Sequence, residues 1–167
     1  MSDTIDTIRR LLVRELDAFV REVELVPDDD TLWKVTGGVS NSCGNLALHV
    51  SGNLQDYVGR VLGGLDYVRD REREFATRAG SRADVVAELR RAAAAVDATL
   101  RGLDPARLDE VFPVALGSVQ PRIGVLLVHL VSHTAFHLGQ AGYLRRVLTG
   151  STATSGALPI TDLIGGA

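Results

Sequence analysis

The chain has 167 residues, of which 46% are hydrophobic and 23% are charged, and its formal net charge is −3. This length predicts one globular domain with a sizeable core, because a second domain would be very small. Nucleic acid is not expected as a partner, since binding to phosphates requires an excess of positive charge on the surface.

The sequence predicts neither a membrane segment nor a disulfide. The longest nearly unbroken apolar stretch, residues 123–131, is interrupted by His129 and is much shorter than the roughly 20 residues that a membrane span needs. The first six residues are polar and acidic rather than signal-like, so we expect a cytoplasmic location. Cys43 is the single cysteine, which excludes an intrachain disulfide and a cluster of thiolate ligands.

Apolar residues recur at steps of three and four along four segments, which predicts four amphipathic helices. The first covers residues 3–24. The second follows the capping run at residues 40–42 and ends at the two glycines 63–64. Two glycines within this second helix, Gly44 and Gly52, are expected to allow close helix packing.

The third and fourth helices are also bounded by recognisable signals. Ser81 and Asp84 resemble a capping box at the start of the third helix, which continues to Leu103. Pro121 is expected in the first turn of the fourth helix, which ends at Gly150. The short apolar run at residues 111–116 contains a proline and is not expected to form a strand.

These signals predict an all-α four-helix bundle with long connections. About fifteen residues separate successive helices, which is longer than the joints of simple bundles. Residues 66–80 are long enough to return along the whole second helix, so we expect a crossover between helices two and three, although spacing alone also allows an antiparallel arrangement. We expect one domain over residues 1–150 and a C-terminal tail over residues 151–167, either mobile or folded back on the bundle.

All four histidines fall in predicted helices, which makes them the main candidates for a functional site. His133 and His137 are four residues apart and therefore lie on one face of the fourth helix, close enough to bind one ion. His49 is the remaining histidine on another helix and sits beside inward-facing positions. His129 lies one turn before His133, so spacing alone allows either pair on the fourth helix.

Two amides are candidates to orient the ligands. Asn53 follows His49 by one turn and Gln140 follows His137 by three residues, so either side chain could accept a hydrogen bond from an imidazole or contact substrate, or serve only in packing. The alternating charges at residues 69–74 predict a solvated surface, although one arginine could bind a carboxylate of a cofactor. Trp33 is expected to anchor the first loop.

Two sequence runs resemble DinB-like proteins. The run SNSCGNLALHVSGNL at residues 40–54 and the run HTAFHLGQ at residues 133–140 are similar to the two conserved blocks of that family. Trp33 and residues 66–75 extend the resemblance, which covers residues 32–148.

The resemblance implies a four-helix bundle with a long crossover, usually homodimeric, and a metal site at His49, His133 and His137. It gives His129 no ligand role, which leaves that residue in the pocket. Related members include thiol-dependent S-transferases and a mycothiol-dependent isomerase. Fold membership alone does not fix the reaction.

The expected function is that of a divalent-metal-binding protein, with zinc favoured and nickel or iron as alternatives. Three neutral imidazoles leave the charge of the ion uncompensated, which favours an anionic ligand and predicts activation of a low-molecular-weight thiol, such as mycothiol or bacillithiol, for transfer to a small electrophile. No nucleophile of the protein itself is evident. The alternative is a noncatalytic, stress-related homodimer that binds metal or a small ligand.

Overall fold

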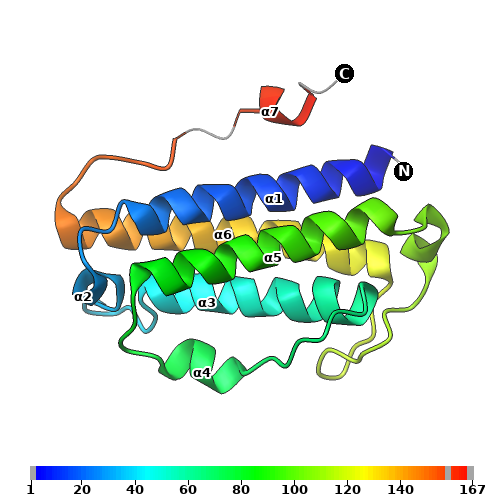
Figure 1. Ribbon diagram of the computed structural model, residues 1–167, viewed down its shortest axis with the longest axis horizontal. Helices are drawn as coiled ribbons and strands as arrows, with labels where there is room; N and C mark the ends of the chain where they lie inside the picture. The colour runs from blue at the N-terminus through cyan, green and yellow to red at the C-terminus, as the bar shows by residue number, and fades with distance from the viewer. Residues whose placement is uncertain (1–2, 157–158, 165–167) are drawn as a thin grey trace.

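The computed structural model describes residues 3–156 and 159–164 of the chain, and these form a bundle of four long helices (Figure 1). The long helices are α1 (Asp3–Glu24), α3 (Cys43–Leu54) with its π-helical continuation η1 (Gln55–Leu62), α5 (Arg82–Gly102) and α6 (Ile123–Thr149). The connections carry the short elements α2 (Asp29–Leu32), α4 (Arg71–Ala76), the 3-10 helix η2 (Pro105–Asp109) and α7 (Thr161–Ile164). Within the described residues, β-pairing is limited to two isolated bridges between residues 111 and 122 and between residues 116 and 119. The predicted all-α bundle is confirmed.

The helix ends follow local capping chemistry. Ser42 accepts a hydrogen bond from the backbone N–H of Asn45 at 3.1 Å, and the Asn45 side chain accepts one from the Ser42 N–H at 3.1 Å, which closes a capping box. Ser81 caps α5 by accepting a hydrogen bond from the Asp84 N–H at 3.1 Å, but the Asp84 carboxylate accepts from the Ser81 hydroxyl at 2.7 Å and not from its backbone, so the predicted capping box is not closed. The sequence suggested that Pro121 lies in the first turn of α6, but the helix begins only at Ile123. The Pro121 carbonyl accepts a hydrogen bond from Phe112 at 2.8 Å, so this residue belongs to the extended segment before the helix.

The predicted crossover between the second and third long helices is confirmed. Gln55 of η1 donates a hydrogen bond to Glu88 of α5 at 3.2 Å, while Gly59 lies against Ala95 further along both helices. Residue numbers rise along both helices from the first contact to the second, which shows that α3–η1 and α5 run parallel. The chain between them, residues 63–81, therefore runs back along the outside of the bundle and carries α4 (Figure 1).

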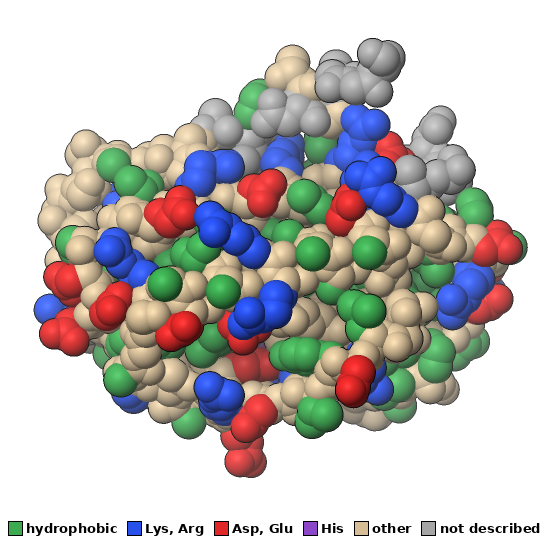
Figure 2. All heavy atoms as spheres, in the orientation of Figure 1, with side chains coloured by type: hydrophobic (Ala, Val, Ile, Leu, Met, Phe, Trp, Pro, Cys, Tyr) green, Lys and Arg blue, Asp and Glu red, His purple; other side chains and the backbone are tan. Residues whose placement is uncertain are grey.

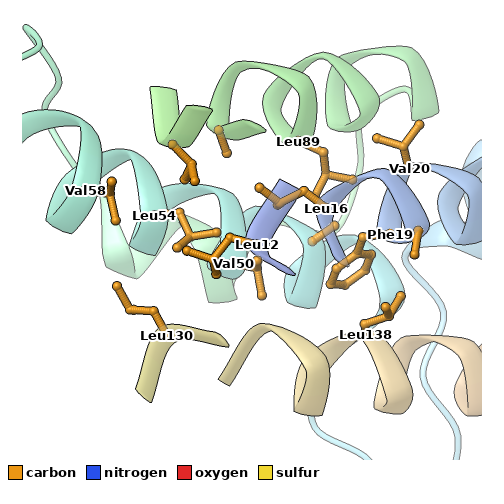
Figure 3. Packing of buried hydrophobic residues seen from close by; sticks show 14 of the residues in the cluster. Leu12, Leu16, Phe19, Val20, Val50, Leu54, Val58, Leu89, Leu130 and Leu138 are labelled. Atoms are coloured by element: carbon orange, nitrogen blue, oxygen red, sulfur yellow. The ribbon is translucent and has the colours of Figure 1, made fainter. Parts of the chain in front are cut away.

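The core lies along the bundle axis, and all four helices contribute to it. Phe19 of α1, Leu54 of α3, Leu89 of α5 and Leu130 of α6 are at most 1% exposed and point inward (Figure 3). Each such side chain stabilises the fold by about 1.5–3 kcal/mol through burial. Both α1 and α3 pack against α5 and α6, so the two ligand-bearing helices, α3 and α6, are direct neighbours.

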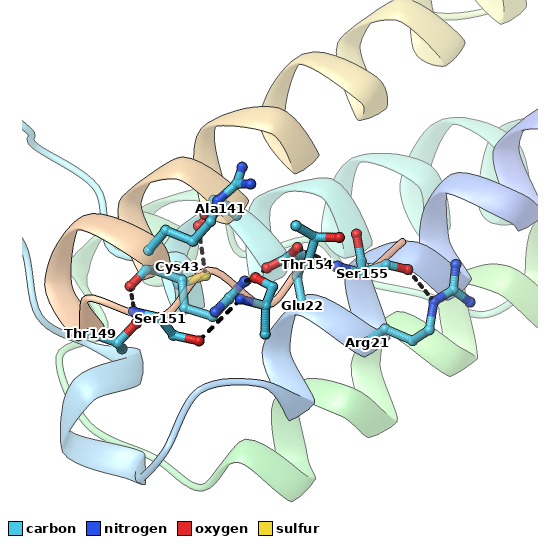
Figure 4. A network of polar contacts seen from close by, with 12 residues as sticks. Arg21, Glu22, Cys43, Ala141, Thr149, Ser151, Thr154 and Ser155 are labelled. Carbon is cyan, nitrogen blue, oxygen red and sulfur yellow. Dashed lines mark hydrogen bonds and ion pairs between the residues drawn. The ribbon is translucent and has the colours of Figure 1, made fainter. Parts of the chain in front are cut away.

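A buried ion pair links α1 to α6 and to the segment after α6 (Figure 4). Arg145 donates to Glu22 Oε2 at 2.7 Å, and Ser155 donates its backbone N–H to Glu22 Oε1 at 2.8 Å. Burial by itself raises the pKa of Glu22, but these hydrogen bonds outweigh it and lower the pKa. Residues 151–156 thus lie along the bundle, and α7 contacts α1. The sequence suggested that residues 158–164 fold back on the bundle; residue 158 lies outside the described residues, and α7, at the end of that segment, contacts α1.

No helix among residues 3–156 and 159–164 is long and apolar enough to cross a bilayer.

Candidate metal centre

Three histidines from two helices converge at one point between α3 and α6. Nε2 of His133 lies 3.3 Å from Nε2 of His49 and 3.2 Å from Nε2 of His137. One ligand atom of each ring lies within 4.8 Å of those of the other two. His49 is buried and the other two rings are half-buried. The fold therefore brings together the three residues that the family resemblance indicated.

The spacing of these nitrogens fits a divalent cation. A tetrahedral ion with nitrogen ligands at 2.0–2.1 Å separates them by about 3.4 Å. The Nε2 atom of His133 faces the Nε2 atoms of both His49 and His137, but it can form an N–H···N hydrogen bond with only one of them at a time. The remaining contact then has no proton to share and brings two nitrogens together without a hydrogen bond, which is unfavourable unless a cation lies between them. The donor set and its distances thus suit a metal ion.

Glu74 fixes the orientation of the His49 ring. Its Oε2 lies 2.9 Å from His49 Nδ1, and Arg69 donates to both of its oxygens at 2.7 and 2.9 Å. Burial raises the pKa of Glu74, but the hydrogen bonds from Arg69 and His49 outweigh this effect and lower the pKa. The ionised carboxylate accepts the Nδ1 proton, which leaves the Nε2 lone pair of His49 directed at the cluster.

The two converging histidines of α6, His133 and His137, have lowered pKa values that favour the neutral ring. The pKa of His133 falls to about 4, because burial disfavours the charged ring and the nearby His137 and His49 repel it. Burial also lowers the pKa of His137. Gln140 Oε1 lies 2.8 Å from His137 Nδ1, so the amide accepts that proton and leaves Nε2 free for a metal. This is the contact that the spacing of Gln140 suggested.

The other two candidates from the sequence are not among the converging side chains. His129 is exposed, with its ring centre 5.7 Å from that of His133, so it neighbours the cluster from the surface without being one of the converging side chains. Asn53 is buried at 8% exposure, and its Oδ1 has no hydrogen-bond partner among the described residues. Glu74, rather than Asn53, orients His49.

Sequence reasoning missed Glu74 and Arg69, because alternating charges predicted a solvated surface at residues 69–74. Their side chains are only 7% and 10% exposed, respectively. The backbone explains the difference: Asn45 of α3 donates to the carbonyls of Glu74 and Thr77 at 2.9 Å each, which ties α4 against α3. The one available signal was the family resemblance, which already extended over residues 66–75.

The two glycines of α3 make room for side chains and not for another helix. A Cβ at Gly52 would overlap the Glu74 carboxylate, and one at Gly44 would meet the Trp33 ring at 2.6–2.9 Å. Trp33 also donates from Nε1 to the carbonyl of Gly80 at 2.8 Å. It therefore anchors the first loop, as predicted, and joins that loop to the end of the crossover.

Aromatic rings surround the cluster, and the cysteine does not join it. Phe75 lies with its ring centre 4.8 Å from that of His49, and Phe136 lies 5.3 Å from His137. Cys43 is buried, with its sulfur 3.6 Å from the carbonyl of Ala141. Burial raises the pKa of this thiol to about 12, so Cys43 is neither a ligand of the cluster nor a nucleophile at neutral pH.

Comparison with known protein families finds a match that covers most of the chain. The sequence profile of the DinB superfamily matches residues 11–141, a range that includes all three converging histidines as well as Arg69, Glu74 and Gln140. A search of curated proteins finds no match.

Proposed function

This chain belongs to the DinB superfamily, and we propose that it is a metal-dependent transferase that activates a low-molecular-weight thiol at its histidine cluster. The convergence of three imidazole nitrogens from α3 and α6 is the observation that carries the proposal. Three protein ligands suit a catalytic metal, because structural zinc is normally closed by four. Zinc is the favoured ion, with nickel and iron as alternatives for imidazole ligands.

A divalent cation at this point would lower the pKa of a thiol or water that reached it and so supply a nucleophile at neutral pH. The residues of the chain set up this chemistry. Glu74 and Gln140 take the Nδ1 protons of His49 and His137, which keeps the opposite nitrogens available. Three imidazole ligands bring no negative charge to the cluster, which favours an anionic thiolate over a neutral ligand.

The thiol must come from solution. Cys43, the only cysteine of the chain, is 1% exposed and its pKa is raised to about 12. Its sulfur lies 3.6 Å from the backbone carbonyl of Ala141 on α6, and it is not among the converging side chains. A small cellular thiol such as mycothiol or bacillithiol would meet the requirement, with a small electrophile as its acceptor.

The first test measures how much metal the purified protein contains. Wild-type protein purified without a metal-affinity tag should contain close to one equivalent of a divalent metal by elemental analysis, and His133→Ala should lose it. His129→Ala is the matched control, because that ring is on the same helix but outside the cluster. Absence of metal from the wild type after loading would refute the proposal, as would equal loss in both variants.

The second test is turnover. Metal-loaded protein is incubated with a panel of bacterial thiols and electrophiles, and conjugates are measured by mass spectrometry. We expect a conjugation rate that falls to background when the metal is removed and in His133→Ala. A stable metal site with no conjugation across the panel would instead favour the noncatalytic binding protein, the second candidate function.

We propose that the protein forms a homodimer through the outer face of α6. This helix exposes Val125, Val128, Phe136, Tyr143 and Val147, each 60–71% exposed, and carries its charged residues only in its last turns. The helix is roughly 40 Å long, so this apolar face could bury a substantial surface against a second copy. The same face serves either candidate function.

Light scattering on the purified protein should give the mass of a dimer, and Val128→Glu should give a monomer. Val68→Glu is the matched control, since Val68 is 88% exposed and lies on the crossover. A monomeric wild type at high protein concentration would refute the dimer.

A further inference from the structure

A cavity lies beneath the crossover, and Glu74, which contacts the histidine cluster, forms part of its wall. Its volume is about 430 Å³, and it is bounded by α3, α4 and α5 together with residues 79–81. Volumes of this order hold small organic ligands. It opens on the face shown in Figure 2, where acidic and basic side chains lie side by side over α4 and α5. We call it the crossover cavity.

Apolar groups form part of its wall. Trp33, Leu48 and Val85 line the crossover cavity, and the Trp33 ring is held in place by its hydrogen bond to Gly80 at 2.8 Å. A fixed aromatic face of this kind suits a flat apolar group or the body of a small organic molecule.

A buried hydroxyl in the same wall lacks a partner. Ser51 is 1% exposed and lines the crossover cavity, yet its Oγ has no hydrogen-bond partner among the described residues. Buried polar groups in folded proteins are nearly always hydrogen-bonded. The missing partner is expected to come from an occupant of the cavity.

The charge of the wall identifies the sign of that occupant. Four carboxylates and two guanidinium groups line the cavity: Asp70, Glu74, Asp84, Glu88, Arg73 and Arg91. Arg69, just outside this lining, pairs with Glu74 at 2.7 Å, so one negative charge remains in excess. Tyr67, also in the wall, has its pKa raised by burial and then by the negative charges of Glu88 and Glu74. The field inside the cavity therefore favours a cation and disfavours an anion.

We propose that the crossover cavity binds a small organic amine, with its ammonium group donating to the Ser51 hydroxyl in the field of the acidic wall and its apolar body against Trp33. The site is separate from the histidine cluster and requires no metal. Glu74 belongs to both, since one of its oxygens faces His49 while its carboxylate lies against Gly52 in the cavity wall.

The chain carries its own reporter for this test. Trp33 is the only tryptophan, so ligand binding in the crossover cavity can be followed by its fluorescence in the metal-free, full-length protein. The probes are three molecules of similar shape: phenethylamine, phenethyl alcohol and hydrocinnamate. We expect a saturable change with the amine and at least about tenfold weaker binding of the alcohol, because hydrogen bonds from a charged donor are stronger. The carboxylate should bind most weakly.

Two variants and a control test the assignment of the polar groups. Glu88→Gln should bring the affinity for phenethylamine close to that for phenethyl alcohol, and Ser51→Ala should weaken it several-fold. Ser51→Ala without ligand should unfold at no lower a temperature than wild type, since it removes an unpartnered hydroxyl. Glu110→Gln is the control, because Glu110 is an exposed carboxylate paired with an arginine on η2 and lies outside the cavity.

The proposal is overturned if the three probes leave the Trp33 fluorescence unchanged up to millimolar concentration, or if hydrocinnamate binds as tightly as phenethylamine. Equal weakening by Glu88→Gln and Glu110→Gln would also overturn it, since that result would reflect net charge and not a site. None of these outcomes depends on metal binding at the histidines.

Discussion

Replacing Glu74 by glutamine should weaken metal binding at the histidine cluster without unfolding the protein. In the wild type, Glu74 Oε2 lies 2.9 Å from His49 Nδ1 and Arg69 donates to both carboxylate oxygens. Glutamine keeps the size of the side chain and one acceptor, but it loses the negative charge and presents an N–H₂ group to one of its two partners. The His49 ring therefore loses basicity or orientation.

Two separate magnitudes follow from this geometry. Loss of an outer-shell partner typically lowers metal affinity by about 10–100-fold, which corresponds to about 1.4–2.7 kcal/mol. The stability of the metal-free fold should also fall. Arg69, whose side chain is only 10% exposed, would be left without its carboxylate, and breaking a buried ion pair costs about 3–5 kcal/mol.

Competition with a chromogenic chelator measures the affinity, and urea unfolding in the presence of a chelator measures the stability. Glu22→Gln is the matched control, because Glu22 and Arg145 form a similarly buried pair whose side chains are 4% and 1% exposed. That variant should lose comparable stability yet keep wild-type metal affinity while folded. If Glu74→Gln also bound metal within twofold of wild type, the orienting role of Glu74 would be wrong.

Three further predictions concern single sites. Cys43 should resist thiol reagents at pH 8 in the native protein and react only on unfolding, because burial raises its pKa to about 12; rapid labelling of folded protein would contradict this. In chelator-treated protein, the His133 ring should stay neutral until about pH 4, since burial and the neighbouring rings lower its pKa. As the pH drops from 6.5 toward 4, the unfolded chain binds this proton before the folded protein does, so the free energy of unfolding should fall. An NMR titration midpoint of His133 near pH 6.5 would refute the prediction. Gly52→Ala should reduce metal affinity because its Cβ displaces Glu74, whereas Gly102→Ala, with open space around it, should not; equal affinities would show that Glu74 adjusts freely.

The sequence by itself determined the four long helices and, through the family resemblance, the three histidines that converge. Steps of three and four residues gave the four long helices, and short-range capping at Ser42 and Ser81 fixed where two of them begin. The i, i+4 spacing of His133 and His137, together with the family resemblance, singled out the residues that converge. These features are local, so they can be read from neighbouring positions along the chain.

Tertiary structure decided what surrounds those ligands. Spacing alone could not show that residues 69–74 turn Glu74 inward, because the contact with His49 spans 25 positions and depends on the crossover lying against α3. The sequence also could not show that His129 is exposed or that the Ser51 hydroxyl lacks a hydrogen-bond partner among the described residues. Each property depends on which face of its helix the other elements cover. A charge pattern records which residues are present, but their burial is set by packing between elements distant in sequence.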